Sequence, residues 1–446
     1  MTHLSRALAL ALLVPSLASA NELSRIYLLA VENDTQLRAA AGARDAALEA
    51  KPIARGALLP QINGTGSVGY QDRTTTVNPF PPTSDSSDTR QYGADITQTV
   101  FNREQWLRLR QASDQVALAQ ARYRTAEQGM MLRATEAYFN VLAAADSTRF
   151  AEAEKKAVER QLELAKKRFE VGLSAITDVQ EAQARYDLTV AQMIEAEQAL
   201  SSAKVALLEI TGATDARVVP LKDEIPLLGP NPDSVNEWLK FATDSNSDLQ
   251  AAEITADIAR KDVSINGSRH WPTVAAQAAY SNSEVPSFFD QQETLQVGVG
   301  VNIPIFAGGS TQAAVRQAGH THEQRLAELE TARRQVERRT RDAYQGVIAG
   351  VSRVKALKQA VLSNTTALEA SEVGLEVGAR TAVDVLNAQR ELYRAQRDYS
   401  RSRYDYLLNI LRLKNAAGQL GPKDLNEIDT LLGADQGPAV AGRIAR

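Results

Sequence analysis

Apolar and polar residues alternate along a short segment in the second half of the chain. Between Leu295 and Ile303 every odd-numbered position is aliphatic, and the even-numbered positions are Gln, Gly or Asn. A period of two is typical of a β-strand with one apolar and one polar face. Three other segments behave similarly, so the sequence predicts four strands, at about 61–72, 90–101, 273–283 and 293–305. The polar segment Asp72–Thr89 is expected to be a loop in water.

Most of the remaining chain has the composition of long helices. Ala, Gln, Glu, Arg and Leu dominate, and aromatic residues make up only 5%. Asn102–Glu170 contains no proline and one glycine, Gly129; as a continuous helix it would be roughly 100 Å long. Helices of this length must pack side by side, as a coiled coil or a helical barrel. Shorter helices are expected before the strands, around Glu22–Arg55 and Ser247–Gly267.

The chain contains an internal repeat. Residues 169–183 align with residues 375–389 at an offset of 206 (384 − 178), and both segments contain Glu-Val-Gly. The same offset relates Tyr138 to Tyr344 and Gly212 to Gly418. Two copies of one helix–strand–helix unit therefore make up most of the chain.

A short glycine-containing segment interrupts the long helices in each copy. These segments are Val171-Gly172-Leu173-Ser174 and Val377-Gly378-Ala379-Arg380. Glycine readily adopts the positive φ that a chain reversal requires. Each segment is therefore expected to close a hairpin of two long helices.

The N-terminus has the features of an export signal. Arg6 is followed by the apolar run Ala7–Val14, by Pro15 and by the small residues Ala18-Ser19-Ala20. We expect residues 1–20 to be a signal peptide and the mature chain to begin near Asn21. Beyond residue 20, charges interrupt every apolar segment, so no transmembrane helix is expected.

Composition excludes several kinds of chemistry. A net charge of −4 over 446 residues gives no electrostatic basis for binding nucleic acid, and the chain has no cysteine. His320 and His322 are two residues apart on a predicted helix, so they do not share a face. No nucleotide-binding or nucleophile motif is present. No catalytic, metal or cofactor site is expected.

The strands have two explanations. An antiparallel sheet that covers a soluble core shows the same alternation as one that crosses a membrane. Four strands cannot close into a barrel, and an open sheet edge in lipid leaves backbone groups unpaired at several kcal/mol each. If these strands lie in a membrane, several chains must share one barrel.

Several motifs together resemble the TolC-type outer membrane channel-tunnels, the family of outer membrane efflux proteins. The motifs are Leu59-Pro60-Gln61, Ala-Tyr-Phe-Asn-Val-Leu at 137–142, and the segments 168–172, 175–180, 210–212 and 377–386. The resemblance covers Asn21 to about Leu420. It implies a mostly α fold with a membrane β-barrel, in which a homotrimer shares one 12-stranded barrel, four strands from each chain. A long α-helical barrel of coiled-coil hairpins would continue it.

The resemblance also assigns parts of the chain to regions. They are the signal peptide (1–20), the first repeat (21–212), a linker and equatorial segment (213–246), the second repeat (247–418), and a C-terminal equatorial segment and tail (419–446). A belt around the tunnel would include Asp233–Ser245.

The function that the resemblance implies is that of a passive exit duct across the periplasm and the outer membrane, without enzymatic activity. It would serve drug efflux or type I protein secretion. Its partners would be a periplasmic adaptor (membrane fusion) protein and an inner-membrane transporter of the RND or ABC type. Docking of these partners at the periplasmic helix tips would open the channel.

The tips carry the candidate site residues. The adaptor-binding candidates are Gly172, Leu173, Ser174, Gly378, Ala379 and Arg380. Arg380 resembles the family's latch arginine, with Thr177 and Asp178 as its partners. Asp384 resembles an aspartate that lines the narrow entrance, where threefold symmetry would make a ring of three carboxylates.

Two positions depart from the family pattern. The family often has tyrosine at the position of Leu375, where it adds a latch hydrogen bond that leucine cannot make. It also often has a second entrance aspartate at the position of Asn387. We therefore expect a weaker entrance field and a less firmly latched closed state.

Two other functions would explain part of the sequence. A stand-alone porin is disfavoured because only four strands are predicted. A soluble periplasmic coiled-coil scaffold or adaptor would account for the helices and the export signal, but not for the alternating strands.

Overall fold

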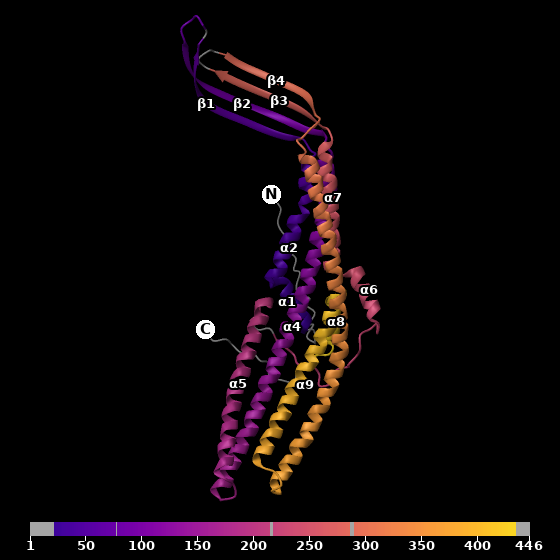
Figure 1. Cartoon of the computed structure of the whole chain (residues 1–446). Coiled ribbons are helices and arrows are strands. Elements are labelled where there is room, and N and C mark those ends of the chain that lie inside the picture. The colour runs from indigo at the N-terminus through magenta and orange to yellow at the C-terminus, as the bar shows by residue number, and fades with distance from the viewer. Residues whose placement is uncertain (1–21, 77, 215–216, 286–289, 434–446) are drawn as a thin grey trace, which may run out of the picture.

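The computed structural model describes residues 22–76, 78–214, 217–285 and 290–433. The expected signal peptide and the residues after 433 lie outside this part of the chain. The described part is elongated, with a sheet at one end, long helices through the middle, and two helical hairpin tips at the other end (Figure 1). Among the described residues, no helix is both long enough and apolar enough to cross a membrane.

Four long helices form the body. They are α4 (Arg103–Glu170), α5 (Ile176–Thr211), α8 (Ser310–Glu376) and α9 (Ala382–Ala416). The 68 residues of α4 and 67 of α8 each correspond to about 100 Å of helix. The helices lie side by side in the order α5, α4, α9, α8, so α5 and α8 are the two edges of this layer (Figure 1).

Shorter helices continue or flank the long ones. They are α1 (Glu22–Asn33), α2 (Thr35–Leu48), α3 (Ala50–Gly56), α6 (Val235–Ser245), α7 (Ser247–Gly267), the 3-10 turn η1 (Ser268–His270) and α10 (Pro422–Asp429). Helix α7 meets the end of α9, because the Asn246 side chain donates a 3.0 Å hydrogen bond to the Ala416 carbonyl. Helix α6 lies against the flank of α8 (Figure 1).

The expected single helix over Glu22–Arg55 is wrong, because the chain breaks at Asp34. The Asp34 side chain accepts a hydrogen bond from the Leu37 amide at 2.6 Å and caps the start of α2. It also forms an ion pair with Arg133 of α4 at 3.0 Å. An aspartate competes for backbone donors in this way and favours a helix start over a helix interior.

The strands form one antiparallel sheet in the order β1-β2-β3-β4. Their bounds are β1 (Gln61–Thr75), β2 (Thr83–Phe101), β3 (Thr273–Val285) and β4 (Asp290–Asn302). Each strand pairs with the next in sequence or, between β2 and β3, across the two repeats.

The register puts apolar residues on one face of the sheet. Ile62, Ile96, Ala278 and Val297 form one row across the four strands. The neighbouring row, on the opposite face, contains Asn63, Asp95, Ala279 and Gln296. None of the helices in the described part of the chain packs on either face of the sheet (Figure 1), and Val297 is 74% exposed although it lies in the middle of β4.

Two boundaries of the strands differ from the expectation. The segment Asp72–Thr89 is not a simple loop, because the ladder continues as far as the pair Thr75 and Thr83. Threonine has a high strand propensity, which its polarity obscures in a sequence. The fourth strand ends at Asn302 and not near residue 305, since Pro304 has no amide hydrogen to donate.

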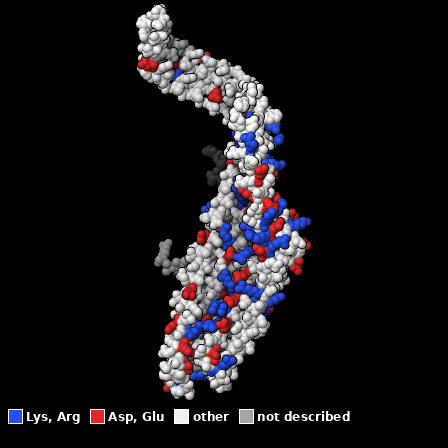
Figure 2. Space-filling view, in the orientation of Figure 1, with Lys and Arg blue, Asp and Glu red and all other residues white. Residues whose placement is uncertain are grey.

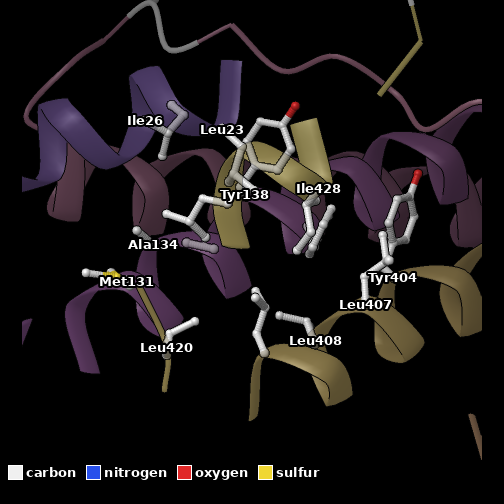
Figure 3. Close-up of a cluster of buried hydrophobic side chains, with 14 of the residues drawn as sticks. Leu23, Ile26, Met131, Ala134, Tyr138, Tyr404, Leu407, Leu408, Leu420 and Ile428 are labelled. Carbon is white, nitrogen blue, oxygen red and sulfur yellow. The ribbon is translucent and has the colours of Figure 1, made fainter. Parts of the chain in front are cut away.

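The main apolar core lies midway along the helices (Figure 3). Tyr138 of α4 is fully buried there, and its hydroxyl donates to the Val219 carbonyl and accepts from the Val219 amide, both at 3.0 Å. Burial raises the pKa of this hydroxyl.

Asp429 at the end of α10 accepts hydrogen bonds from the amides of Leu23 and Ser24 at 2.8 and 3.0 Å. The C-terminal helix thereby caps the N-terminal one.

Candidate functional site

The first hairpin tip joins α4 to α5. Gly172 has φ +73°, and the Leu173 amide donates to the Arg168 carbonyl at 2.8 Å, which closes the last turn of α4. Ser174 donates its hydroxyl hydrogen to the carboxylate of Asp178 at 2.9 Å. Val171 and Leu173 are 69% and 78% exposed. The tip therefore presents two apolar side chains to its surroundings.

The second tip joins α8 to α9 in the same manner. Gly378 has φ +76°, and the amides of Ala379 and Arg380 both donate to the Gly374 carbonyl, at 2.8 and 3.0 Å. The Arg380 side chain folds over Gly374, where an added Cβ would lie only 2.6 Å from the Arg380 Cγ. Val377 is 73% exposed. A residue larger than glycine at 374 would displace the Arg380 side chain.

Asp384 takes part in the start of α9. Its carboxylate accepts hydrogen bonds from the backbone amide and the hydroxyl of Thr381, both at 2.9 Å, and its own amide donates to the Thr381 hydroxyl at 3.2 Å. This capping box lowers the pKa of Asp384, mainly through the hydrogen bond from the Thr381 amide and with a smaller effect of the nearby Arg380. The first tip differs, because Ala175 at the start of α5 has no side-chain cap.

The structure does not bring all the predicted tip residues together. Among the described residues, Arg380 forms no hydrogen bond or ion pair with Thr177 or Asp178 of the same chain, and the two tips are separate (Figure 1). Thr177 and Asn387 are exposed on their helices, and Leu375 is half-buried. The described chain therefore contains no latch between Arg380 and Asp178.

Apolar side chains join the two hairpins above the tips. Val158 and Leu162 of α4, Val179 and Ala182 of α5, and Leu386 of α9 form a small buried cluster. Leu386 lies two residues after Asp384 and thus anchors the first turns of α9 on the first hairpin.

A buried ion triad lies next to this cluster. Glu154 of α4 is 1% exposed. It forms ion pairs with Arg185 of α5 at 2.8 Å and with Arg397 of α9 at 3.0 Å. Tyr393 of α9 also donates its hydroxyl hydrogen to the Ala153 carbonyl at 3.3 Å. The triad joins three of the four long helices, and hence both hairpins.

A second buried carboxylate lies two turns higher on α4. Asp146 accepts hydrogen bonds from Ser400 and, at 2.8 Å, from Tyr404, both on α9. Burial, together with the nearby carboxylate, raises the pKa of Tyr404. The α4–α9 contact is therefore polar at Asp146 and Glu154 and apolar near the tips.

Sequence reasoning missed the triad, although the sequence contains a signal for it. Ala151, Glu154, Val158, Leu162 and Ala165 recur every three or four residues, as the buried stripe of a helix does. A glutamate in such a stripe must have a cationic partner. The chain has too many arginines on its other helices for the sequence to indicate which of them pair with it.

The described residues contain no group of three or more His, Asp and Glu side chains placed to hold a metal ion. His320 lies on the surface of α8 with Glu323 as its neighbour, at 3.2 Å.

Comparison with known proteins identifies relatives along nearly the whole chain. The model of the outer membrane efflux protein family matches residues 26–213 and 238–419. The outer membrane protein TolC of Vibrio cholerae is 38% identical, over 92% of this chain and 93% of that protein. TolC of Escherichia coli is 34% identical over 94% of this chain and 86% of that protein. The alkaline protease secretion protein AprF of Pseudomonas aeruginosa is 31% identical over 93% and 88%.

Solved structures show the same fold at lower identity. The outer membrane protein VceC of Vibrio cholerae superposes with a TM-score of 0.75 at 19% identity, covering 90% of this chain and 96% of that one. The CmeC outer membrane channel of Campylobacter jejuni superposes with a TM-score of 0.77 at 16% identity, covering 93% and 90%.

We predict that Glu154→Gln strongly destabilises the contact between the hairpins. The change leaves Arg185 and Arg397 without their charged partner, and breaking a buried pair costs about 3–5 kcal/mol. Thermal unfolding of the purified protein should show a lower midpoint. The matched control is Glu163→Gln, which breaks the exposed pair with Lys167 on the same helix and should change the midpoint little. Equal midpoints for the two variants would contradict the role of Glu154.

We predict that the first turn of α9 exchanges its amide hydrogens more slowly than the first turn of α5. The reason is that Thr381 caps α9, whereas α5 has no side-chain cap. Hydrogen exchange with mass spectrometry should show this difference. Thr381→Ala should remove it, because loss of the cap destabilises the helix start by about 1 kcal/mol.

The pH dependence of this difference has a definite sign. The pKa of Asp384 is lowered in the fold. Its stabilisation of the first turn of α9 is therefore fully present at a pH above the ordinary aspartate pKa near 3.9, and it is lost as the pH falls through the lowered pKa. If the slow exchange of α9 persists in Thr381→Ala and also at low pH, the capping box is not its cause.

Proposed function

The chain belongs to the outer membrane efflux protein family, and from this premise we propose that three copies form one gated exit duct across the periplasm and the outer membrane. As a member of this family it is a transport channel of the outer membrane that extends into the periplasm, and it is not an enzyme. The trimer, the gate and the partners are the proposal.

The open sheet carries the proposal. In the described structure β1 pairs only with β2, and β4 only with β3, so both edges of the sheet present unpaired backbone groups. The apolar face is also uncovered, with Ile62 and Leu295 71% and 74% exposed. Lipid can cover the apolar face, but it cannot form hydrogen bonds with the backbone groups at the edges. Three sheets joined edge to edge give a closed 12-stranded barrel and leave no edge.

The edge helices support the same arrangement. Leu188, Ile194 and Val205 of α5 are 48%, 60% and 55% exposed, and on α8 Leu362 and Val373 are 60% and 59% exposed. Helices α5 and α8 are the two ends of the helical layer, so α5 of one copy would meet α8 of the next. Such a head-to-tail contact closes into a ring when the rotation between copies permits it.

The ring accounts for the separated latch residues. If α5 of one copy lies beside α8 of the next, the α4–α5 tip lies beside the neighbour's α8–α9 tip. Arg380 would then reach Thr177 and Asp178 of the adjacent copy and hold the closed state. Leucine at 375 adds no hydrogen bond to this latch.

The tips are the proposed docking site for partners. Val171, Leu173 and Val377 are apolar and exposed at the ends of the hairpins, next to the adaptor-binding candidates Gly172, Ser174, Gly378, Ala379 and Arg380. A periplasmic adaptor would bind here and link the duct to an inner-membrane transporter of the RND or ABC type. The family model, which is named for efflux, and AprF, which is named for alkaline protease secretion, support drug efflux or type I secretion as the process.

We expect the protein in outer-membrane fractions, as a species about three times the mass of its monomer on a mild-detergent gel; removal of residues 1–20 would leave the monomer slightly lighter than the 48.4 kDa of the 446-residue chain. Heating should convert that species to the monomer. Ile194→Asp on α5 should lower the temperature of this conversion, because it puts a charge in the contact between copies. Recovery as a soluble monomer would instead support the periplasmic scaffold or adaptor.

We expect Asn387→Asp to strengthen block of single channels by a trivalent cation in planar bilayers. Three additional carboxylates would line the entrance beside those of Asp384 and would attract cations more strongly. Asp384→Ala should remove most of the block that the unaltered protein shows. If Asn387→Asp leaves the block unchanged, residues 384 and 387 do not form the entrance ring.

A further inference from the structure

The helix ends next to the sheet carry a concentration of positive charge. We call this region the collar and define it as residues 50–58, 102–111, 265–272 and 306–318, the segments that lead into or out of the four strands. Its basic residues are Lys51, Arg55, Arg103, Arg108, Arg110, Arg269 and Arg316, and its acidic residue is Glu104. The collar thus has a charge of +6 (7 − 1), although the whole chain has −4.

The charge of the collar is exposed and largely uncompensated. Glu104 forms ion pairs with Arg108 at 2.6 Å and with Arg269 at 3.7 Å. The side chains of these two arginines are nevertheless 51% and 47% exposed, and the other five basic residues are also exposed. Figure 2 shows Lys and Arg on the helices just below the sheet, and few charged residues on the sheet itself.

Two tryptophans mark the level of the collar relative to a bilayer. Trp106 and Trp271 are 51% and 46% exposed, and the Arg103 guanidinium lies 4.3 Å from the centre of the Trp271 ring. Tryptophan is enriched where the hydrocarbon of a membrane meets water. The third tryptophan, Trp238, is 4% exposed in α6.

The sheet beside the collar contains a band without charge on its apolar face. Residues 61–71, 91–101, 273–283 and 294–302 include one charged residue, Asp95. Asp95 lies on the polar face, where its carboxylate accepts a hydrogen bond from Asn63 at 3.2 Å. About 9–11 residues per strand are enough to cross the hydrocarbon of a bilayer. The collar therefore lies at one boundary of this band.

The other boundary of the band has a different charge. There residues 72–90 and 284–293 contain six acidic residues and two basic ones (Arg73 and Arg90), a net charge of −4 (2 − 6). The net charge is thus positive at the helix end of the sheet, which is the periplasmic end in this family's orientation, and negative at the other end.

We propose that the collar binds anionic phospholipid headgroups in the periplasmic leaflet of the outer membrane. The guanidinium group matches a phosphate with two parallel hydrogen bonds. A basic residue near an anionic surface contributes about 1 kcal/mol, equivalent to about a fivefold change in a binding constant. The basic residues of the collar lie within about 8 residues of the helix ends that face the sheet, or roughly 12 Å of helix, which is somewhat more than the screening length of about 8 Å in physiological salt.

This binding rests on the proposed membrane-spanning barrel and fixes its depth. The apolar band alone permits the barrel to slide along the membrane normal by small amounts. Headgroups held by the collar oppose movement of the helices into the hydrocarbon, because the arginines would lose both water and phosphate.

The tryptophans of the collar allow a direct test. Full-length protein is reconstituted in phosphatidylcholine vesicles that contain 20 mol% phosphatidylglycerol, with bromine on the acyl chains of either the anionic or an equal amount of the zwitterionic lipid. Quenching of tryptophan fluorescence then reports which lipid lies near Trp106 and Trp271, since buried Trp238 is shielded. We expect quenching by the anionic lipid to exceed that by the zwitterionic lipid about twofold or more, and the ratio to fall towards one in 0.5 M NaCl.

Matched variants distinguish the collar from charge in general. Arg55→Gln, Arg110→Gln and Arg316→Gln combined should bring the quenching ratio close to one. The control removes three exposed arginines from lower on α8 (Arg333→Gln, Arg338→Gln and Arg341→Gln) and should leave the ratio unchanged.

Two outcomes would overturn the inference, and a third would refute the barrel on which it rests. Equal quenching by the two brominated lipids in the unaltered protein means that the collar has no preference for anionic lipid. An unchanged ratio in the collar variant, with an altered salt dependence of conductance, means that these arginines face the lumen. Quenching by neither lipid, from a protein that does not insert, would instead refute the proposed barrel itself.

Discussion

The structure depends on the requirement that every backbone amide and carbonyl in a membrane be hydrogen-bonded. In the four-stranded sheet this requirement is met between neighbouring strands, but β1 and β4 at its edges have unpaired amides and carbonyls. The single chain is therefore incomplete at the sheet, and the uncovered apolar residues of α5 and α8 make it incomplete along the helices as well. One cause accounts for both observations, because chains that close a barrel through their strands must also meet along the helices that continue it.

The sequence predicts the elements well wherever one physical period dominates. The alternation from Leu295 to Val301 and the Val-Gly tips follow from local geometry, so they can be recognised without any tertiary information. The break at Asp34 was missed, although its cap on the Leu37 amide is local; the ion pair of Asp34 with Arg133, 99 residues away, could not be predicted from the sequence. The ladder that extends to Thr75 and Thr83 was also missed, because polar strand residues resemble loop residues in composition.

The sequence predicted where the hairpin tips lie, but not the contacts that their side chains make. Glycine at 172 and 378 indicates where the helices reverse, and the fold has both residues at positive φ. The partners of Arg380 belong to another copy in the proposed ring, so no property of one chain can place them. Asp384 was expected as an entrance charge, and the fold adds its role in capping α9. Asp384 keeps its charge in mild acid, because the capping hydrogen bonds lower its pKa.

The two kinds of ion pair along the hairpins differ in strength, and the difference limits where a gate could bend. The proposed latch of exposed pairs at the tips would contribute about 0–1 kcal/mol for each pair. Separating buried Glu154 from Arg397 would leave a charge without a partner in the core, at a cost of several kcal/mol. Between these levels the α4–α9 contact is apolar and contains Val158, Leu162 and Leu386. Apolar side chains can slide past one another without leaving a polar group unpaired, but the triad permits no such movement. An opening motion would therefore be confined to the part of the hairpins between Glu154 and the tips, about 16 residues of α4 or roughly 24 Å of helix, while the helices above the triad keep their places.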